Sequence, residues 1–250
     1  MMTYLGVQSG QPSDRIWRLR RLSDQDVSTF SWVSAGSRLP NGARYSSSAV
    51  VVGCILYVIG GNTESGSPCC DLYSYNMKSG LWTTLTPMTH ARAGFCAVAV
   101  VESSSILVCG GFGKDKGVLD SAEMYNIGTD SWSMLPSMRF QRSRASGVLY
   151  DDRVVVVGGW CNGRALRSVE CFDVQRGVWD EMPQLAFGRH GMGVQHVPWK
   201  EKTGTLYAVG GWNSDGRIMT TVEVFEKRVG HWARKPDLAL PHGRGWMGVA

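Results

Sequence analysis

Short apolar runs that end in paired glycines recur along the chain. Four runs stop at a Gly-Gly pair, and the first glycines of these pairs are Gly60, Gly110, Gly158 and Gly210. A run such as CILYVIGG is continuous, rich in β-branched residues and too short for an average helix, which is typical of a strand buried on both faces. The runs therefore predict four buried strands at nearly even spacing.

Two further landmarks keep the same period of about 50 residues. An alternating segment such as VECFDV follows each run and predicts a half-buried strand. A Gly- or Asp-containing turn then leads to a tryptophan, with another aromatic seven residues before it; the pairs are Tyr75 and Trp82, Tyr125 and Trp132, Phe172 and Trp179, and Phe225 and Trp232. An arginine opens the apolar stretch before each run and also starts a final one; these are Arg44, Arg92, Arg142, Arg189 and Arg244. Three landmarks with one period indicate a structural repeat.

Each repeat is expected to form a sheet of four short strands. The glycines permit close backbone approach and positive φ after the inner strand. The spaced aromatics supply area that neighbouring sheets can bury against each other. Because one such sheet cannot bury its faces alone, the repeats must stack.

This pattern resembles the kelch repeat. The resemblance rests on the Gly-Gly pairs, on the Glu-x-aromatic…Trp sets that begin at Glu123, Glu170 and Glu223, and on the P-x-M-x-x-x-R connection from Pro136 to Arg142. It covers residues 44–250 and implies an all-β fold, a β-propeller of four-stranded blades, closest in look to the propeller domain of kelch-like (BTB-kelch) proteins. The first repeat departs from the pattern, with Tyr73 where the other repeats carry glutamate.

The whole chain, residues 1–250, is expected to form one propeller domain. Four complete repeats span approximately residues 44–91, 92–141, 142–188 and 189–243. Residues 1–43 would complete a composite blade with residues 244–250: MTYLGVQSG, RIWRLRRL and TFSWVS supply its second, third and fourth strands, and RGWMGVA its inner strand. Five blades would result, with six blades and a fragmentary chain as the alternative.

The repeated arginines are the first candidate binding residues. The kelch resemblance implies that Arg44, Arg92, Arg142, Arg189 and Arg244 line the mouth of a central channel and grip acidic peptide segments. A guanidinium group suits this role because its fork of donors matches a carboxylate. In the alternative, each arginine pairs with a framework glutamate on an adjacent strand.

Aromatic residues after the paired glycines are the second candidates. Phe112, Trp160 and Trp212 stand there, and Asn62 takes the place in the first repeat. Aromatics beside arginine at an exposed edge are favoured contact residues in interfaces. The alternative is that they pack one blade against the next.

No catalytic residue, metal ligand or cofactor is assigned. The five histidines lack ligand spacing, the seven cysteines contain no Cys-x-x-Cys pair, and GGFGKDKG lacks the ending of a phosphate loop. The chain is therefore expected to be a protein-binding module and not an enzyme. A small-molecule enzyme on the same scaffold, such as a sugar epimerase or lyase using His190 and Arg189, is the alternative.

Net charge and targeting signals limit which partners and which cellular compartment are expected. The net charge of +5 is mild and does not indicate nucleic acid, and the basic RIWRLRR tract is typical of a solvated strand face. Neither a signal peptide nor a membrane-spanning run is found, so the cytoplasm is expected, with the nucleus also possible. The resemblance implies protein partners, in a cullin–RING ubiquitin ligase as a substrate adaptor or with actin. The ligase role normally needs a BTB or F-box segment, for which no room exists ahead of Trp17, so that segment is expected from elsewhere in a longer gene product or from a partner.

Overall fold

The structure is a computed structural model that describes residues 3–4, 7–8, 11–12, 15–21, 30–115, 117–197 and 204–245, with side chains from Ser37 onward. The chain divides into two compact units, a first unit up to Ala93 and a second unit that begins at Gly94. Apart from one 3₁₀ turn at Pro236–Leu238, every regular element among the described residues is a strand. The predicted all-β class is confirmed, whereas the single domain stays a prediction.

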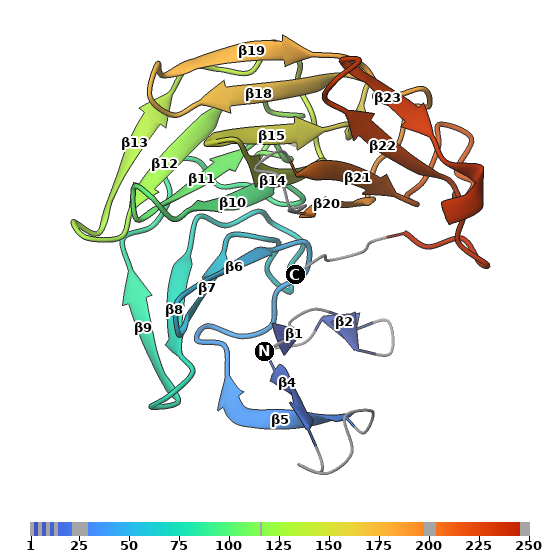
Figure 1. Cartoon of the computed structure of the whole chain (residues 1–250). Coiled ribbons are helices and arrows are strands. Elements are labelled where there is room, and N and C mark those ends of the chain that lie inside the picture. The colour runs from blue at the N-terminus through green and yellow to red at the C-terminus, as the bar shows by residue number, and fades with distance from the viewer. Residues whose placement is uncertain are drawn as a thin grey trace. The chain divides into compact units, whose positions relative to one another are not determined.

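The first unit contains one complete four-stranded sheet. It consists of β6 (Ser48–Val52), β7 (Ile55–Ile59), β8 (Leu72–Asn76) and β9 (Leu81–Leu85), each antiparallel to the next (Figure 1). Its core gathers Leu39, Leu56, Val58, Tyr73 and Tyr75. This sheet is the first predicted repeat, with strand order and turns as expected.

The N-terminal segment forms a three-stranded sheet in the order β1 (Thr3–Tyr4), β4 (Arg15–Arg21) and β5 (Phe30–Arg38), with a small hairpin of β2 (Val7–Gln8) and β3 (Gln11–Pro12). Its three strands fall in the three segments that the sequence assigns to the composite blade. The inner strand of that blade was expected from residues 244–250, of which residues 246–250 lie outside the described part. Closure into five blades therefore stays a prediction.

The second unit contains three four-stranded meanders (Figure 1). The first has β10 (Cys96–Val100), β11 (Ser105–Cys109), β12 (Ala122–Asn126) and β13 (Ser131–Leu135). The second has β14 (Ser146–Tyr150), β15 (Arg153–Val157), β18 (Val169–Asp173) and β19 (Val178–Met182), with a side hairpin of β16 (Trp160–Cys161) and β17 (Arg164–Ala165). The third has β20 (Gly193–Val197), β21 (Thr205–Val209), β22 (Val222–Glu226) and β23 (His231–Arg234). We call these sheets blades B, C and D.

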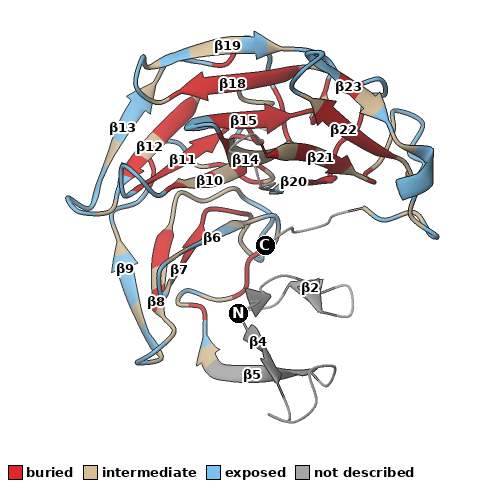
Figure 2. Cartoon of the chain, viewed as in Figure 1, coloured by how far each residue is buried: buried red, intermediate tan, exposed pale blue. Residues whose placement is uncertain are grey.

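Burial falls from the inner strands of each blade to its outer strand (Figure 2). Every residue of β11 and β18 is buried, whereas β13 and β19 are exposed or half-buried. One apolar cluster joins β10 and β11 to β15, and another joins β15 and β18 to β20, β21 and β22. The aromatic pairs lie across the two outer strands, with ring centroids 5.1 Å apart for Phe172 and Trp179. The hydrophobic pattern is thus used to stack blades face to face.

The paired glycines are required where one blade meets the next. At Gly158, φ is +58°, and an added Cβ would lie 2.4 Å from the carbonyl oxygen of Arg189. The amide of Gly159 donates to that same oxygen at 2.9 Å. Since φ is positive and no space exists for a side chain, only glycine suits this approach.

Strand direction brings two kinds of loop to one edge of each blade. The loops after the paired glycines and the connections between blades form what we call the connection edge, residues 112–121, 136–144, 160–168, 183–191 and 212–221 of the second unit. The tight turns within each blade, at residues 101–104, 127–130, 151–152, 174–177 and 227–230, form the opposite hairpin edge. In the described part of the chain, no helix has the length and apolar character needed to cross a bilayer.

Candidate functional site

Two of the repeated arginines form buried clamps at the connection edge. Arg142 donates from Nη1 to the carbonyl of Gly158 at 2.7 Å and pairs through Nη2 with Glu170. Arg189 donates to the carbonyl of Gly210 at 3.0 Å and to Glu223 Oε1 at 2.6 Å. All four charged side chains are buried. Each arginine therefore joins the end of the second strand of its blade to the third strand.

The glutamates of these clamps also hold the connections between blades. Glu170 accepts the backbone amide of Arg139 at 2.7 Å, and Glu223 accepts that of Ala186 at 2.6 Å. Hydrogen bonds from a charged side chain and from backbone amides together offset the free-energy cost of removing the carboxylate from water. The clamp thus fixes where each connection lies, and with it the edge that carries the loops.

The first repeat holds its buried arginine with a different set of residues. Arg44 donates to Asp71 Oδ2 at 2.7 Å, and the hydroxyl of Tyr73 donates to the same oxygen at 3.1 Å. Burial, and then the charge of Asp71, raises the pKa of Tyr73 to about 12, so the phenol stays a donor. Asp71 stands two residues before Tyr73, where Ser168 and Thr221 assist the other clamps. The unusual Tyr73 is therefore compensated within one strand.

These contacts place the arginine candidates in two groups. Arg44, Arg92, Arg142 and Arg189 are buried. Arg44, Arg142 and Arg189 pair with carboxylates, as the framework alternative describes. Arg244 is exposed, with its backbone carbonyl accepting the amide of Gly211 at 2.7 Å. Contact between any of these arginines and a partner stays a prediction.

The aromatic candidates lie half-buried at the connection edge, each against a neighbouring loop. Trp160 meets His190 of the next blade with ring centroids 4.9 Å apart and an interplanar angle of 68°. Phe112 lies under the guanidinium of Arg144, 5.6 Å from Cζ to the ring centroid. Trp212 exchanges backbone hydrogen bonds with His190. Packing between blades and partial exposure thus occur together, and a binding role for these aromatics stays a prediction.

Arg144 is a connection-edge residue that the sequence reasoning missed. It has φ +53° at a place where the neighbouring blades use Gly94 and Gly191, both also with positive φ. Its amide donates to Gly94 at 2.6 Å and its carbonyl accepts from Gly191 at 2.9 Å, so the backbone is held there from both sides. Non-glycine residues in this conformation cluster at functional sites. The available signal was an arginine at a glycine position, two residues after the repeated arginine.

His190 and Arg189, the pair named for an enzyme, lie in different environments. Arg189 is held by Glu223. Burial, and then the charge of Arg144, lowers the pKa of His190 to about 4, so its imidazole is neutral at pH 7. Across the described residues, no three histidine, cysteine or acidic side chains gather in a way that could hold a metal ion.

An exposed groove lies between the connection 139–141 and the side hairpin of blade C. Its volume is about 310 Å³, and its lining includes Arg139, Phe140, Gln141 and Arg164. Phe140 is 38% exposed, and Phe187, at the same place before the next repeated arginine, is 46% exposed. The sequence reasoning missed these residues as well. A recurring aromatic or histidine two residues before four of the five repeated arginines, at His90, Phe140, Phe187 and His242, was the signal that could have found them.

The family model that describes the KLHDC2/KLHL20/DRC7 Kelch-repeats domain matches residues 46–246. The chain belongs to this kelch-repeat family. The kelch expectation drawn from the repeats is confirmed, and with it the propeller fold class.

Known proteins similar to this kelch chain come from animals and plants. Kelch-like protein 36 of Bos taurus is 27% identical over 252 residues, which cover 93% of this chain and 38% of that protein. An F-box/kelch-repeat protein of Arabidopsis thaliana is 29% identical over 150 residues, which cover 58% of this chain and 34% of that protein. The solved structure of YjhT has a TM-score of 0.78 at 16% identity, covering 96% of this chain and 82% of that one, which shows likeness of fold. The kelch chain spans about a fifth to two fifths of the length of the curated relatives it matches.

Proposed function

We propose that this kelch chain is a non-enzymatic module that binds acidic segments of partner proteins at its connection edge. The observation that carries the proposal is the groove whose lining includes Arg139, Arg164 and the exposed Phe140. Aromatic and arginine side chains together are the residue types that dominate binding energy in interfaces. A guanidinium fork adds specificity for carboxylates.

The predicted binding residues enter this proposal in two roles. Arg244, Phe112, Trp160 and Trp212 are proposed to contact the partner, because each retains exposed surface. The three aromatics lie at the connection edge, and the carbonyl of Arg244 accepts the amide of Gly211 directly before it. Arg44, Arg92, Arg142 and Arg189 are proposed to act from inside the fold, by fixing the loops that the partner touches. Arg144, above Phe112, joins the first group.

A finer proposal concerns the assembly in which the module works. The names of relatives that couple kelch repeats to an F-box, and the Kelch-like relatives, support a role as substrate receptor of a cullin–RING ligase. An actin-associated scaffold is the alternative. Co-purification with a cullin subunit supports the receptor role, and co-sedimentation of the purified chain with actin filaments supports the scaffold role.

The connection-edge proposal is tested with a short glutamate-rich peptide and the full chain. We expect Arg164→Glu to weaken binding about tenfold, equivalent to about 1.4 kcal/mol, because the change puts a like charge beside the partner's carboxylates. Added salt weakens binding to the unmodified chain. Arg228→Glu makes the same charge change at the hairpin edge and serves as the control. Equal affinities for the unmodified chain and Arg164→Glu would overturn the proposal.

A further inference from the structure

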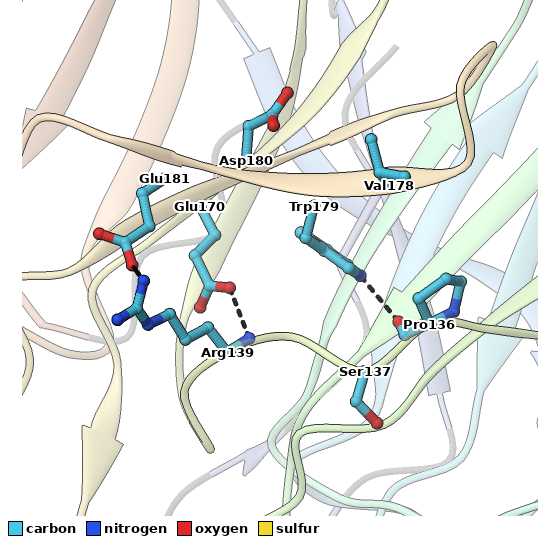
Figure 3. Close-up of a pocket in the computed structure, with 8 residues that line it drawn as sticks. All are labelled: Pro136, Ser137, Arg139, Glu170, Val178, Trp179, Asp180 and Glu181. Atoms are coloured by element: carbon cyan, nitrogen blue, oxygen red, sulfur yellow. Dashed lines mark hydrogen bonds and ion pairs between the residues drawn. The ribbon is translucent and has the colours of Figure 1, made fainter.

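A second groove lies on the outer side of blade C, away from the hairpin that flanks the first. It has a volume of about 510 Å³ and runs between the connection 136–139 and four consecutive residues of β19, residues 178–181 (Figure 3). Its size is within the usual range for a ligand pocket. Since β19 is the last strand of its sheet, one edge of its backbone lies outside the ladder and is open to an extended chain.

The exposed charge of the groove is that of Glu181 and its partner Arg139. Of the other carboxylates of the lining, Glu170 is buried against Arg142, and Asp180 points to the other side of β19 and pairs with Arg176 at 3.2 Å. Glu181 stands directly opposite Glu170 in the β18–β19 register, and the charge of Glu170 is already met by the buried guanidinium of Arg142. Glu181 is therefore the carboxylate of the groove that an outside cation can reach.

Arg139 already shows how a guanidinium fits there. Its side chain pairs with Glu181, and both groups are exposed, by 70% and 48%. Exposed pairs of this kind contribute little to stability, because water screens the two charges. A cation from outside can therefore replace Arg139 at little cost, while the buried pair of Arg142 and Glu170 stays in place.

The indole of Trp179 supplies an aromatic wall for the groove. Its Nε1 donates to the carbonyl of Pro136 at 2.8 Å, which fixes the ring between the two sides of the groove (Figure 3). A ring face held in this way attracts a cation within about 6 Å of its centroid. The groove thus offers both a carboxylate and a π system.

Blade D lacks these features at the same positions. Arg234 stands where blade C has Glu181, and Ala186 stands where it has Arg139. The Trp232 equivalent of Trp179 is buried, and its Nε1 has no hydrogen-bond partner among the described residues. The groove is a departure from the repeat and not part of the framework that the repeat builds.

We propose that this groove docks a basic segment of a partner protein, which lies extended along β19 and places an arginine or lysine side chain between Trp179 and Glu181. The docking site is separate from the proposed acidic-segment site at the connection edge. Arg139 is shared between them, because it lines both grooves. It should favour an acidic ligand in the first groove and compete with a basic ligand in the second.

The test uses the full chain labelled with fluorotryptophan and two short Gly-Ser peptides, one carrying two arginines and the other two glutamates. The fluorine signal of Trp179 is assigned by its loss in Trp179→Phe. We expect the arginine peptide to shift this signal saturably and the glutamate peptide to leave it unchanged. We expect Glu181→Gln to weaken binding of the arginine peptide about fivefold, and Glu102→Gln, on the hairpin edge, to leave its affinity unchanged.

Whether Arg139→Ala raises or lowers the affinity for the arginine peptide decides the proposal. Removal of the competing guanidinium is expected to tighten binding of the arginine peptide about threefold. Weaker binding in Arg139→Ala, or an equal shift of the Trp179 signal by the glutamate peptide, would overturn the proposal. The connection-edge proposal is scored separately, by the loss of glutamate-peptide binding in Arg164→Glu, so either proposal can fail alone.

Discussion

At the scale of single residues, the buried arginine and glutamate side chains of this kelch chain hold its strands and connections in place, and they are enclosed within the fold. Glu170 joins the guanidinium of Arg142 to the backbone amides of the preceding connection. Burial of two charges costs about as much as their attraction returns, but loss of one partner leaves an uncompensated charge inside the protein. The repeated arginine and glutamate are therefore coupled positions, and single substitutions at either should be severe.

Substitution Glu170→Ala should lower the free energy of unfolding by about 3–5 kcal/mol, because Arg142 then stays buried without its carboxylate. The matched control is Glu181→Ala, directly opposite on β19, which removes an exposed pair and should cost at most about 1 kcal/mol. Urea unfolding of the two variants measures the difference. Similar losses in both would contradict the clamp.

The buried histidine predicts a pH dependence of stability. The pKa of His190 lies at about 4 in the folded chain, below its ordinary value of 6.5. As the pH falls below 6.5, the unfolded chain binds a proton before the folded chain does, so stability is lost between pH 6.5 and about 4. The loss attributed to this group is about 2–3 kcal/mol.

His190→Asn should flatten the stability profile over this pH range, since the neutral amide has no proton to gain. His231→Asn, at an exposed position, should leave the slope as it is. Unfolding free energies measured at several pH values test this. An unchanged slope in His190→Asn would show that another group carries the dependence.

At the scale of elements, the repeat dictates strands and blade contacts but leaves the loops undetermined. Continuous and alternating apolar patterns located the inner and third strands, because burial on one or two faces leaves a mark in the sequence. The side hairpin of β16 and β17 and the groove beside Phe140 left no such mark, because residues 160–166 belong to one loop and are not repeated. Arg144 replaces a glycine of the repeat, and the backbone shows that the glycine conformation is kept there.

Substitution Gly158→Ala tests the contact between blades. The added Cβ would meet the carbonyl oxygen of Arg189 at 2.4 Å, and φ is positive, so we expect a loss of about 3 kcal/mol or more in unfolding free energy. Gly177→Ala at the hairpin edge has a similar positive φ but open space around it, and should cost about 1 kcal/mol. Thermal and urea unfolding compare the two. Equal costs would show that backbone conformation alone, and not the close approach, requires glycine at Gly158.

At the scale of the whole molecule, a repeated framework carries unrepeated surfaces. The family match and the likeness of fold to YjhT concern the framework, which is the part that sequence periodicity could predict. Binding is proposed at two grooves in the second unit, both beside the connection that contains Arg139. Their opposite proposed preferences would let one chain bring an acidic and a basic partner segment together.

The most direct test of the connection-edge assignment is hydroxyl-radical footprinting of the full chain, read by mass spectrometry, with and without the glutamate-rich peptide. The account predicts protection of Phe140 and Trp160, which lie at the connection edge. It predicts unchanged oxidation of Val101 and Val229, which are exposed at the hairpin edge. Protection of the two valines, with Phe140 and Trp160 unaffected, would contradict the account.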